Sequence, residues 1–154
     1  MELKRRGTYC NCIRCREVRG EKVDAESLRL DDLIYFPDGA EEHFISFITP
    51  ADSIAGFLRL SLPGPDSPST GLKDLETAAI IREVHVYGQS LGVGKELSGA
   101  AQHAGLGTRL LAEADRIARE KDYRRMAVIA AVGTRQYYLE RGFERGELYL
   151  TKKI

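Results

Sequence analysis

A strand–loop–helix–strand pattern between residues 78 and 131 constrains the fold of this chain more than any other feature. Residues 78–87 form a run with strand-like alternation. After a glycine-rich stretch, an apolar stripe at helical spacing follows: Leu106, Leu110, Ala114 and Ile117. This helix should end near residues 121–123, before the apolar run 126–131 that is typical of a buried strand. Since such a unit forms a right-handed crossover, the two strands should be parallel within one sheet.

Strand-like segments precede and follow this unit. Those before it are residues 27–30, 33–36, 42–48 and 54–62. Pro37-Asp38-Gly39 is a turn signal, and residues 49–53 have the length of a hairpin loop. Residues 135–141 predict a short helix that ends at Gly142, and residues 143–150 predict a strand or hairpin. The fold class we expect is therefore α+β (α/β-like), with a mixed central β-sheet flanked by helices.

Length and charge narrow the class of protein. The 154 residues suit one domain with a real core, and the formal net charge of zero excludes a polycation built to coat nucleic acid. No apolar run reaches membrane-spanning length, and the first residues are charged where a signal peptide would be apolar. We expect a cytoplasmic protein without a membrane partner.

The first 26 residues show neither a helical nor a strand period, but they are basic and rich in cysteine. Three cysteines, Cys10, Cys12 and Cys15, lie close together, and clustering in an odd number favours a metal over a disulfide framework. Three thiolates can converge on one zinc ion, which needs a fourth ligand. The histidines available are His43, His85 and His103, of which His85 is our candidate. Three free thiols are the alternative.

A glycine-containing segment opens the long helix. Gln102-His103-Ala104-Gly105-Leu106-Gly107-Thr108 has the form Gln-x-x-Gly-x-Gly. The first turn of a helix has backbone N–H groups without an internal partner, and glycines let a ligand approach them closely. A pyrophosphate resting on these amides fits that chemistry. On spacing alone, an ordinary turn and helix cap is equally compatible.

Several motifs carry a family resemblance. Residues 78–87, 102–108 and 138–143 (Tyr-Leu-Glu-Arg-Gly-Phe) resemble the GNAT acetyltransferase superfamily. Residues 14–19, 82–88, 102–108 and 133–138, taken in this order, are similar to the catalytic subunit of the Elongator complex, in its C-terminal acetyltransferase half and the cysteine segment before it. The resemblance covers most of the chain. It implies a zinc-binding-like segment at residues 1–26 and a GNAT domain at residues 27–154.

The resemblance implies a function in tRNA modification. In that family a radical-SAM domain, with S-adenosylmethionine and an iron–sulfur cluster, attacks the wobble uridine, and the acetyltransferase half supplies acetyl-CoA. Three cysteines cannot provide both a cluster motif and the zinc-like knot, so the chain should be an excised half or a stand-alone relative. Its implied partners are tRNA, the radical-SAM domain and other subunits of an Elongator-type assembly. Ala104 and Gln136 depart from the family pattern, and the two helices usual between the first GNAT strands have little room.

The resemblance also implies residue roles. Acetyl-CoA would be held by Val84, His85, Val86, Gln102, His103, Gly105, Leu106, Gly107, Thr108 and Tyr138. The strand that ends at Val86 would splay from its neighbour, whereas ordinary sheet pairing is the alternative. His103 could equally bind the metal or tRNA. The basic residues that could face tRNA phosphates, or simply be solvated, are Lys4, Arg5, Arg6, Arg14, Arg16 and Arg19.

Four residues are candidates for catalysis: Tyr137 and Tyr138 as acids, and Glu83 and His85, which share one face of their strand, as bases. A phenol can protonate the leaving thiolate, and Tyr138 matches the position of the superfamily's general acid, so we favour it over Tyr137. Adjacent helical residues diverge by about 100°, so the two rings cannot occupy one spot. Glu83 is a candidate base if its face of the strand is buried, because burial makes a carboxylate bind a proton more tightly. A salt-bridged Glu83 is equally compatible.

These features together predict an acetyl-CoA-dependent acyltransferase domain. It would supply the acetyl group for C5 modification (carboxymethylation) of the tRNA wobble uridine beside a radical-SAM domain. One alternative is a free-standing N-acetyltransferase that acts on lysine or another amine. The other is a zinc-stabilised RNA-binding or docking module whose CoA site is vestigial.

Overall fold

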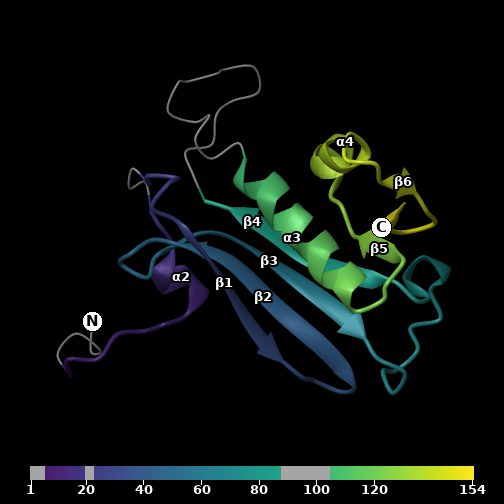
Figure 1. Cartoon of the computed structure of the whole chain (residues 1–154), viewed down its shortest axis with the longest axis horizontal. Helices are drawn as coiled ribbons and strands as arrows, with labels where there is room; N and C mark the ends of the chain where they lie inside the picture. Colours follow the sequence, from purple (N-terminus) through teal and green to yellow (C-terminus); the bar gives the residue numbers. More distant parts are fainter. Residues whose placement is uncertain (1–5, 20–22, 88–104) are drawn as a thin grey trace.

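One seven-stranded sheet organises the chain (Figure 1). The computed structural model describes residues 6–19, 23–87 and 105–154. The strands are β1 (Arg29–Tyr35), β2 (Ala40–Ile48), β3 (Ile54–Pro63), β4 (Ala79–Val86), β5 (Arg125–Val128), β6 (Glu144–Arg145) and β7 (Leu150–Lys153). The helices are α2 (Ile13–Arg16), α3 (Leu106–Glu120) and α4 (Arg135–Leu139), with 3-10 turns η1 (Lys73–Leu75) and η2 (Val132–Thr134).

The strand order is β1-β2-β3-β4-β5-β7-β6. Among the described residues, every neighbouring pair is antiparallel except β4 and β5. The predicted parallel pair is therefore confirmed, and α3 lies on the connection between its strands. The expected mixed sheet flanked by helices is confirmed as well.

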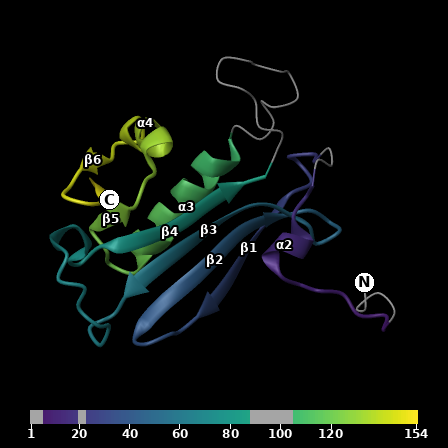
Figure 2. The same ribbon diagram turned by 180° about the vertical axis from the view of Figure 1, so that it is seen from behind.

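The apolar stripe of α3 explains where this helix lies. Leu106, Leu110, Ala114 and Ile117 are buried, and they belong to one core cluster with Leu58 of β3. Figures 1 and 2 show the helix lying along one face of the sheet. The helix ends at Glu120, as its sequence predicts, and positive φ at Asp122 (64°) turns the chain toward β5.

Two strands differ in length from the prediction. Residues 27–36 were expected to hold two short strand-like stretches, but the structure has the single strand β1, paired with β2 along its whole length. The polar pair Asp31 and Asp32 interrupts the apolar pattern without interrupting the backbone pairing, since β1 is an edge strand with exposed positions. Strand β5 ends at Val128, before the exposed Ile129.

The N-terminal segment packs onto the sheet rather than preceding it loosely. Val18 and Val23 are buried in the main core, and the Val18 amide donates a hydrogen bond to the Ile54 carbonyl (3.2 Å). Ile13 of α2 contacts a second cluster, on the face opposite α3, that contains Phe57. These contacts are single anchors without a period, so the sequence pattern did not reveal them.

The connection between β1 and β2 is short. It comprises residues 36–39, with positive φ at Asp38 (40°) and Gly39 (77°). No helix lies between these strands, which agrees with the lack of room noted in the sequence. No helix in the described ranges combines the length and the apolar character needed to cross a membrane.

Candidate functional site

The start of α3 is a close-packed junction of three elements. Gly105 is the N-cap residue, and its carbonyl accepts a hydrogen bond from the Arg109 amide (2.9 Å). Gly107 is buried, and a Cβ built on it would lie 2.7 Å from the Tyr137 hydroxyl oxygen and 3.7 Å from a Val86 methyl. A side chain at residue 107 would therefore displace Tyr137. Glycine at this position thus lets Tyr137 of α4 and Val86 of β4 pack against the first turn of α3.

Strand β4 is only partly paired on the side of β5. The parallel register covers Ala79 to Ile81, opposite Met126 to Val128. Beyond Ile81 the strand continues to Val86, and in the described chain its remaining pairing is with β3. The two parallel strands thus separate beside the start of α3, as the resemblance implies. Among the described residues, no strand pairs with the backbone of residues 82–86 on that side.

Tyr137 and Tyr138 point in different directions from α4, as helical geometry requires. Their rings meet edge to face, with centroids 5.2 Å apart. Tyr138 is buried against Phe143, and burial, reinforced by Tyr137, raises the pKa of its phenol above the ordinary value, while Arg141 opposes the rise. Tyr138 therefore stays protonated at neutral pH, which a proton donor requires.

Gly142 sets the position of this tyrosine pair. Its φ of 81° ends α4, and the Phe143 amide donates a hydrogen bond to the Tyr138 carbonyl (3.2 Å). This arrangement is the expected glycine stop. It turns the chain so that Phe143 packs under Tyr138.

Glu83 and His85 lie on the same face of β4, and that face is not buried. They pair in register with Arg59 and Phe57 of β3. The Glu83 carboxylate is exposed and lies 3.8 Å from the Arg59 guanidinium, so the condition set for Glu83 as a base, a buried face, is not met. The imidazole of His85 is stacked on Phe57 (centroids 5.9 Å apart) and is tilted against the ring of Tyr87 (4.6 Å).

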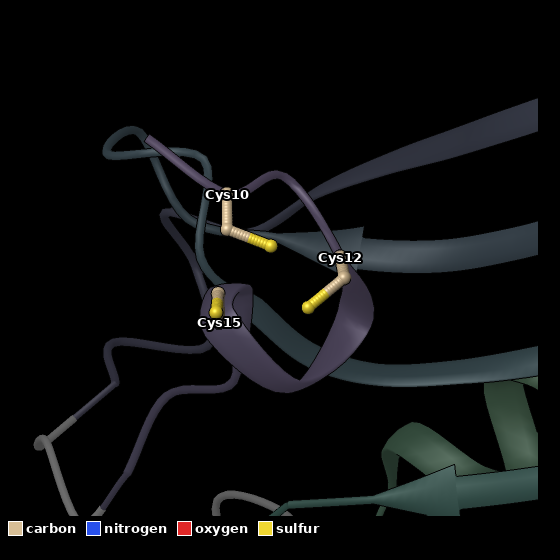
Figure 3. Close-up of side chains that lie close together, drawn as sticks. All are labelled: Cys10, Cys12 and Cys15. Atoms are coloured by element: carbon tan, nitrogen blue, oxygen red, sulfur yellow. The ribbon is translucent and has the colours of Figure 1, made fainter. Parts of the chain in front are cut away.

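The three cysteines lie close together, on α2 and directly before it (Figure 3). The sulfurs of Cys10, Cys12 and Cys15 all lie within 4.8 Å of one another, and all three residues are exposed. A tetrahedral zinc site places sulfur ligands roughly 3.8 Å apart, since each Zn–S bond is about 2.3 Å. The cluster thus fits three zinc ligands, but among the described residues the group does not extend to His85.

The thiols share protons unequally. A hydrogen bond from Cys10 lowers the pKa of Cys12 to about 7, and a hydrogen bond with Cys12 raises that of Cys15 to about 11. A turn from Cys12 supports the arrangement, because its carbonyl accepts from the Cys15 and Arg16 amides at 3.0 and 3.1 Å. The knot therefore holds a thiolate readily, as metal ligation requires.

The basic residues proposed to face tRNA differ in how they are held. Arg16 donates to the Asp52 carbonyl (2.9 Å) and to its carboxylate (2.6 Å), which anchors α2 to the β2–β3 turn. Arg19 donates to the Arg14 carbonyl (2.9 Å). Lys4 and Arg5 lie outside the described residues, as do Gln102 and His103 of the proposed cofactor loop.

Arg141 is a site residue that the sequence reasoning missed. It comes from the end of α4, yet its Nη2 donates to the Thr108 hydroxyl at the start of α3 (3.0 Å). The only signal in the sequence was that Arg141 is a basic residue directly before Gly142. Its contact with Thr108 could not be predicted, because the two residues lie far apart in the sequence.

Comparison with solved structures identifies the fold. The chain aligns with a putative streptothricin acetyltransferase from Bacillus anthracis in complex with acetyl coenzyme A, at a TM-score of 0.54 and 14% identity, covering 85% of this chain and 98% of the other. A putative acyl-CoA N-acyltransferase from Klebsiella pneumoniae has the same TM-score at 12% identity, covering 84% of this chain and 99% of the other. No family model matches the sequence. The fold is that of the GNAT acetyltransferases.

Sequence relatives give a more specific similarity. The chain is 37% identical to a tRNA uridine(34) acetyltransferase of Dehalococcoides mccartyi, across 99% of this chain and 34% of the relative. It is 39% identical to Elongator complex protein 3 of Dictyostelium discoideum, across 99% and 28%. The structure of Elp3 from Methanocaldococcus infernus aligns at a TM-score of 0.81 and 32% identity, covering 99% of this chain and 37% of the other. The chain is thus similar over nearly its whole length to tRNA uridine(34) acetyltransferases and Elongator complex protein 3, and it spans about a third of the length of these relatives.

Proposed function

We propose that this chain binds acetyl-CoA and supplies its acetyl group for C5 modification (carboxymethylation) of the tRNA wobble uridine, as the acetyltransferase part of an Elongator-type enzyme. The observation that carries the proposal is the junction at Gly107. A buried glycine in the first turn of α3 lies against Val86 and Tyr137, beside the open side of β4. Helix N–H groups and a free strand edge meet there, and CoA carries a pyrophosphate and an amide-rich arm that match them.

In this proposal each element binds one part of the cofactor. The first turn of α3, from Gly105 to Thr108, binds the pyrophosphate through backbone N–H groups. Residues 84–86 bind the pantetheine arm and the acetyl carbonyl, where an N–H group stabilises the developing oxyanion. Gln102 and His103 belong to the same proposed loop. We also propose that residues 1–26 form a zinc-binding segment and residues 27–154 the acetyltransferase domain.

The proton donor in this proposal is Tyr138. When a nucleophile adds to the acetyl carbonyl and the C–S bond breaks, the leaving thiolate takes the phenol proton. Tyr137 lies against Gly107 and therefore at the pyrophosphate end of the arm, away from the sulfur. We assign it to cofactor packing. Glu83 is not assigned as a base in this proposal, because its carboxylate is exposed and lies 3.8 Å from the Arg59 guanidinium.

The cysteine knot and the basic segment complete the proposal. Cys10, Cys12 and Cys15 would hold zinc with a fourth ligand other than His85, which lies outside the group. Arg6, Arg14 and Arg19, with Lys4 and Arg5, would meet tRNA phosphates. Arg16 would contribute less, because it is already paired with Asp52. A radical-SAM domain would act on the uridine carbon.

Acetyl-CoA hydrolysis by the purified chain, with and without tRNA, tests this function. Hydrolysis stimulated by tRNA is the expected result, since RNA would gate the site. Hydrolysis that is indifferent to tRNA, together with acetylation of an amine, would instead indicate a free-standing N-acetyltransferase. Binding of tRNA without any affinity for acetyl-CoA would indicate a vestigial site.

A further inference from the structure

The guanidinium of Arg141 is fixed across two helices. Its Nη1 donates to the Tyr137 carbonyl (2.8 Å), its Nη2 donates to the Thr108 hydroxyl oxygen (3.0 Å), and its central carbon lies 3.6 Å from the centroid of the Tyr137 ring. A planar cation on an aromatic face with two hydrogen bonds has little freedom to move. The charge is therefore held beside the first turn of α3.

The hydrogen-bonding capacity of Arg141 is not exhausted by the chain. A guanidinium has five N–H donors, and in the described part of the molecule two of them have acceptors. Its Nε is buried there without a hydrogen-bond partner. The buried Nε is out of reach of a ligand, so the donors left for one are the second N–H groups of Nη1 and Nη2. Both partners that the structure provides are neutral, and neither neutralises the charge.

The surroundings of this cation favour an anion. The first turn of α3 contains no acidic residue, and it adds free N–H groups and the positive end of the helix dipole. Thr108 takes part as well. Because its oxygen accepts from Arg141, its hydroxyl hydrogen is left to point elsewhere, and it can donate to a phosphate oxygen.

We infer that Arg141, together with Thr108, is a ligand of the CoA pyrophosphate and determines how tightly this chain binds the cofactor. The inference rests on the proposed function and extends it from backbone amides to a charged side chain. A guanidinium suits the task, since its fork matches phosphate oxygens in a bidentate contact. The pyrophosphate, rather than the 3′-phosphate, is assigned because Arg141 is bonded to the first turn of the helix.

Calorimetric titration with acetyl-CoA tests the assignment. Arg141→Met removes the charge and keeps much of the apolar stem, whereas Arg141→Lys keeps the charge and loses the fork. Arg116→Ala is the control, since it removes one cation from α3 about 12 Å further along the helix axis than Thr108. Thermal unfolding of each variant checks the fold, and Arg141→Lys provides the result if Arg141→Met does not fold.

We expect Arg141→Met to weaken acetyl-CoA binding about tenfold or more, as loss of a charge-assisted hydrogen bond implies. Arg141→Lys should give a smaller loss, and Arg116→Ala a change within about twofold. The dependence of affinity on salt should flatten in Arg141→Met, because one phosphate contact is lost. Removing the 3′-phosphate from acetyl-CoA should leave the tenfold effect in place.

Unchanged affinity in Arg141→Met, with tight binding by the parent chain, would overturn the inference and leave the proposed function intact. An effect that disappears with dephosphorylated acetyl-CoA would move the contact to the 3′-phosphate and refute the pyrophosphate assignment. Absence of acetyl-CoA binding by the folded parent chain would refute the proposed function and this inference together.

Discussion

The charged side chains at the two ends of α3 differ in their partners. At the end of the helix, the Lys121 ammonium contacts the Glu41 carboxylate at 2.7 Å, Glu41 contacts the His43 ring at 2.9 Å, and the other ring nitrogen of His43 contacts Asp32 at 2.8 Å. At the start of the helix, Arg141 meets only neutral groups among the described residues.

We interpret the charges at the end of α3 as structural, and that of Arg141 at its start as available to a ligand. A cavity of about 400 Å³ lies at the paired end, lined in part by Phe36, Leu62 and Tyr123. Its charged lining residues, Glu41 and Lys121, already neutralise one another. Arg141, which has no anionic partner among the described residues, lies at the other end, beside the first turn of the helix. We therefore place the candidate site at the start of α3, beside Arg141, and not at the cavity beside Glu41 and Lys121.

Replacing Tyr138 with Phe should give the largest effect and confine it to catalysis. Loss of a proton donor should lower acetyl-CoA hydrolysis by about a hundredfold, while affinity stays within a few-fold. Steady-state kinetics and calorimetry on the same preparation measure the two quantities. The comparison variant is Tyr137→Phe, which keeps the ring at the start of α3 and should retain most turnover. Equal losses in both variants would contradict the separate roles.

Gly107→Ala should damage the start of the helix next most strongly. Its Cβ would lie 2.7 Å from the Tyr137 hydroxyl and would displace it, so acetyl-CoA affinity should fall about tenfold. Gly133→Ala is the control, because a Cβ there would have open space. Tight binding by Gly107→Ala would show that the junction with Tyr137 is not needed for the cofactor.

Glu41→Gln tests the opposite end. It leaves Lys121 and His43 without their carboxylate, and the free energy of unfolding should fall by about 1–2 kcal/mol, measured by urea denaturation. Acetyl-CoA affinity should not change. Glu147→Gln, whose carboxylate is exposed and 3.9 Å from Lys73, should have no measurable effect on stability. A loss of affinity in Glu41→Gln would remove the distinction between the two ends.

The smallest effect that we predict is on pH dependence. The contribution of Glu41 to the free energy of unfolding should decrease gradually as the pH falls. The hydrogen bond from Lys121, with a weaker contribution from His43, holds the pKa of Glu41 below its ordinary 4.5 in the folded chain. The stabilisation is then fully present above pH 4.5 and is lost as the pH falls through the lower, folded value. Urea titrations at several pH values should find the parent chain and Glu41→Gln converging at low pH. A gap that widens on acidification would contradict this sign.

Features encoded by regular spacing of apolar residues could be predicted from the sequence. Features that rest on single tertiary contacts could not. The stripe from Leu106 to Ile117 and the parallel strand pair were predictable, since regular spacing encodes them. The anchoring of Val18 in the core was not, because one buried residue has no period. Arg141 was missed for a related reason: its contact with Thr108 joins residues 33 positions apart.

The candidate site shows the same limit. Burial of the Glu83 face could not be decided from the strand pattern, since sheet order determines which face a helix covers. The convergence of the three cysteines was predictable from their short spacing alone, whereas a fourth ligand depends on the folded chain.

Amide chemical shifts during a titration with acetyl-CoA test the central claim most directly. In a ¹H–¹⁵N spectrum of the folded chain, the amides of Gly107, Thr108 and Arg109 should shift most, and those of Glu41 and Lys121 should stay in place. This result would show that the open end of α3 binds the cofactor. Shifts centred on Glu41 and Lys121, or none at Gly107 under saturating acetyl-CoA, would contradict the account.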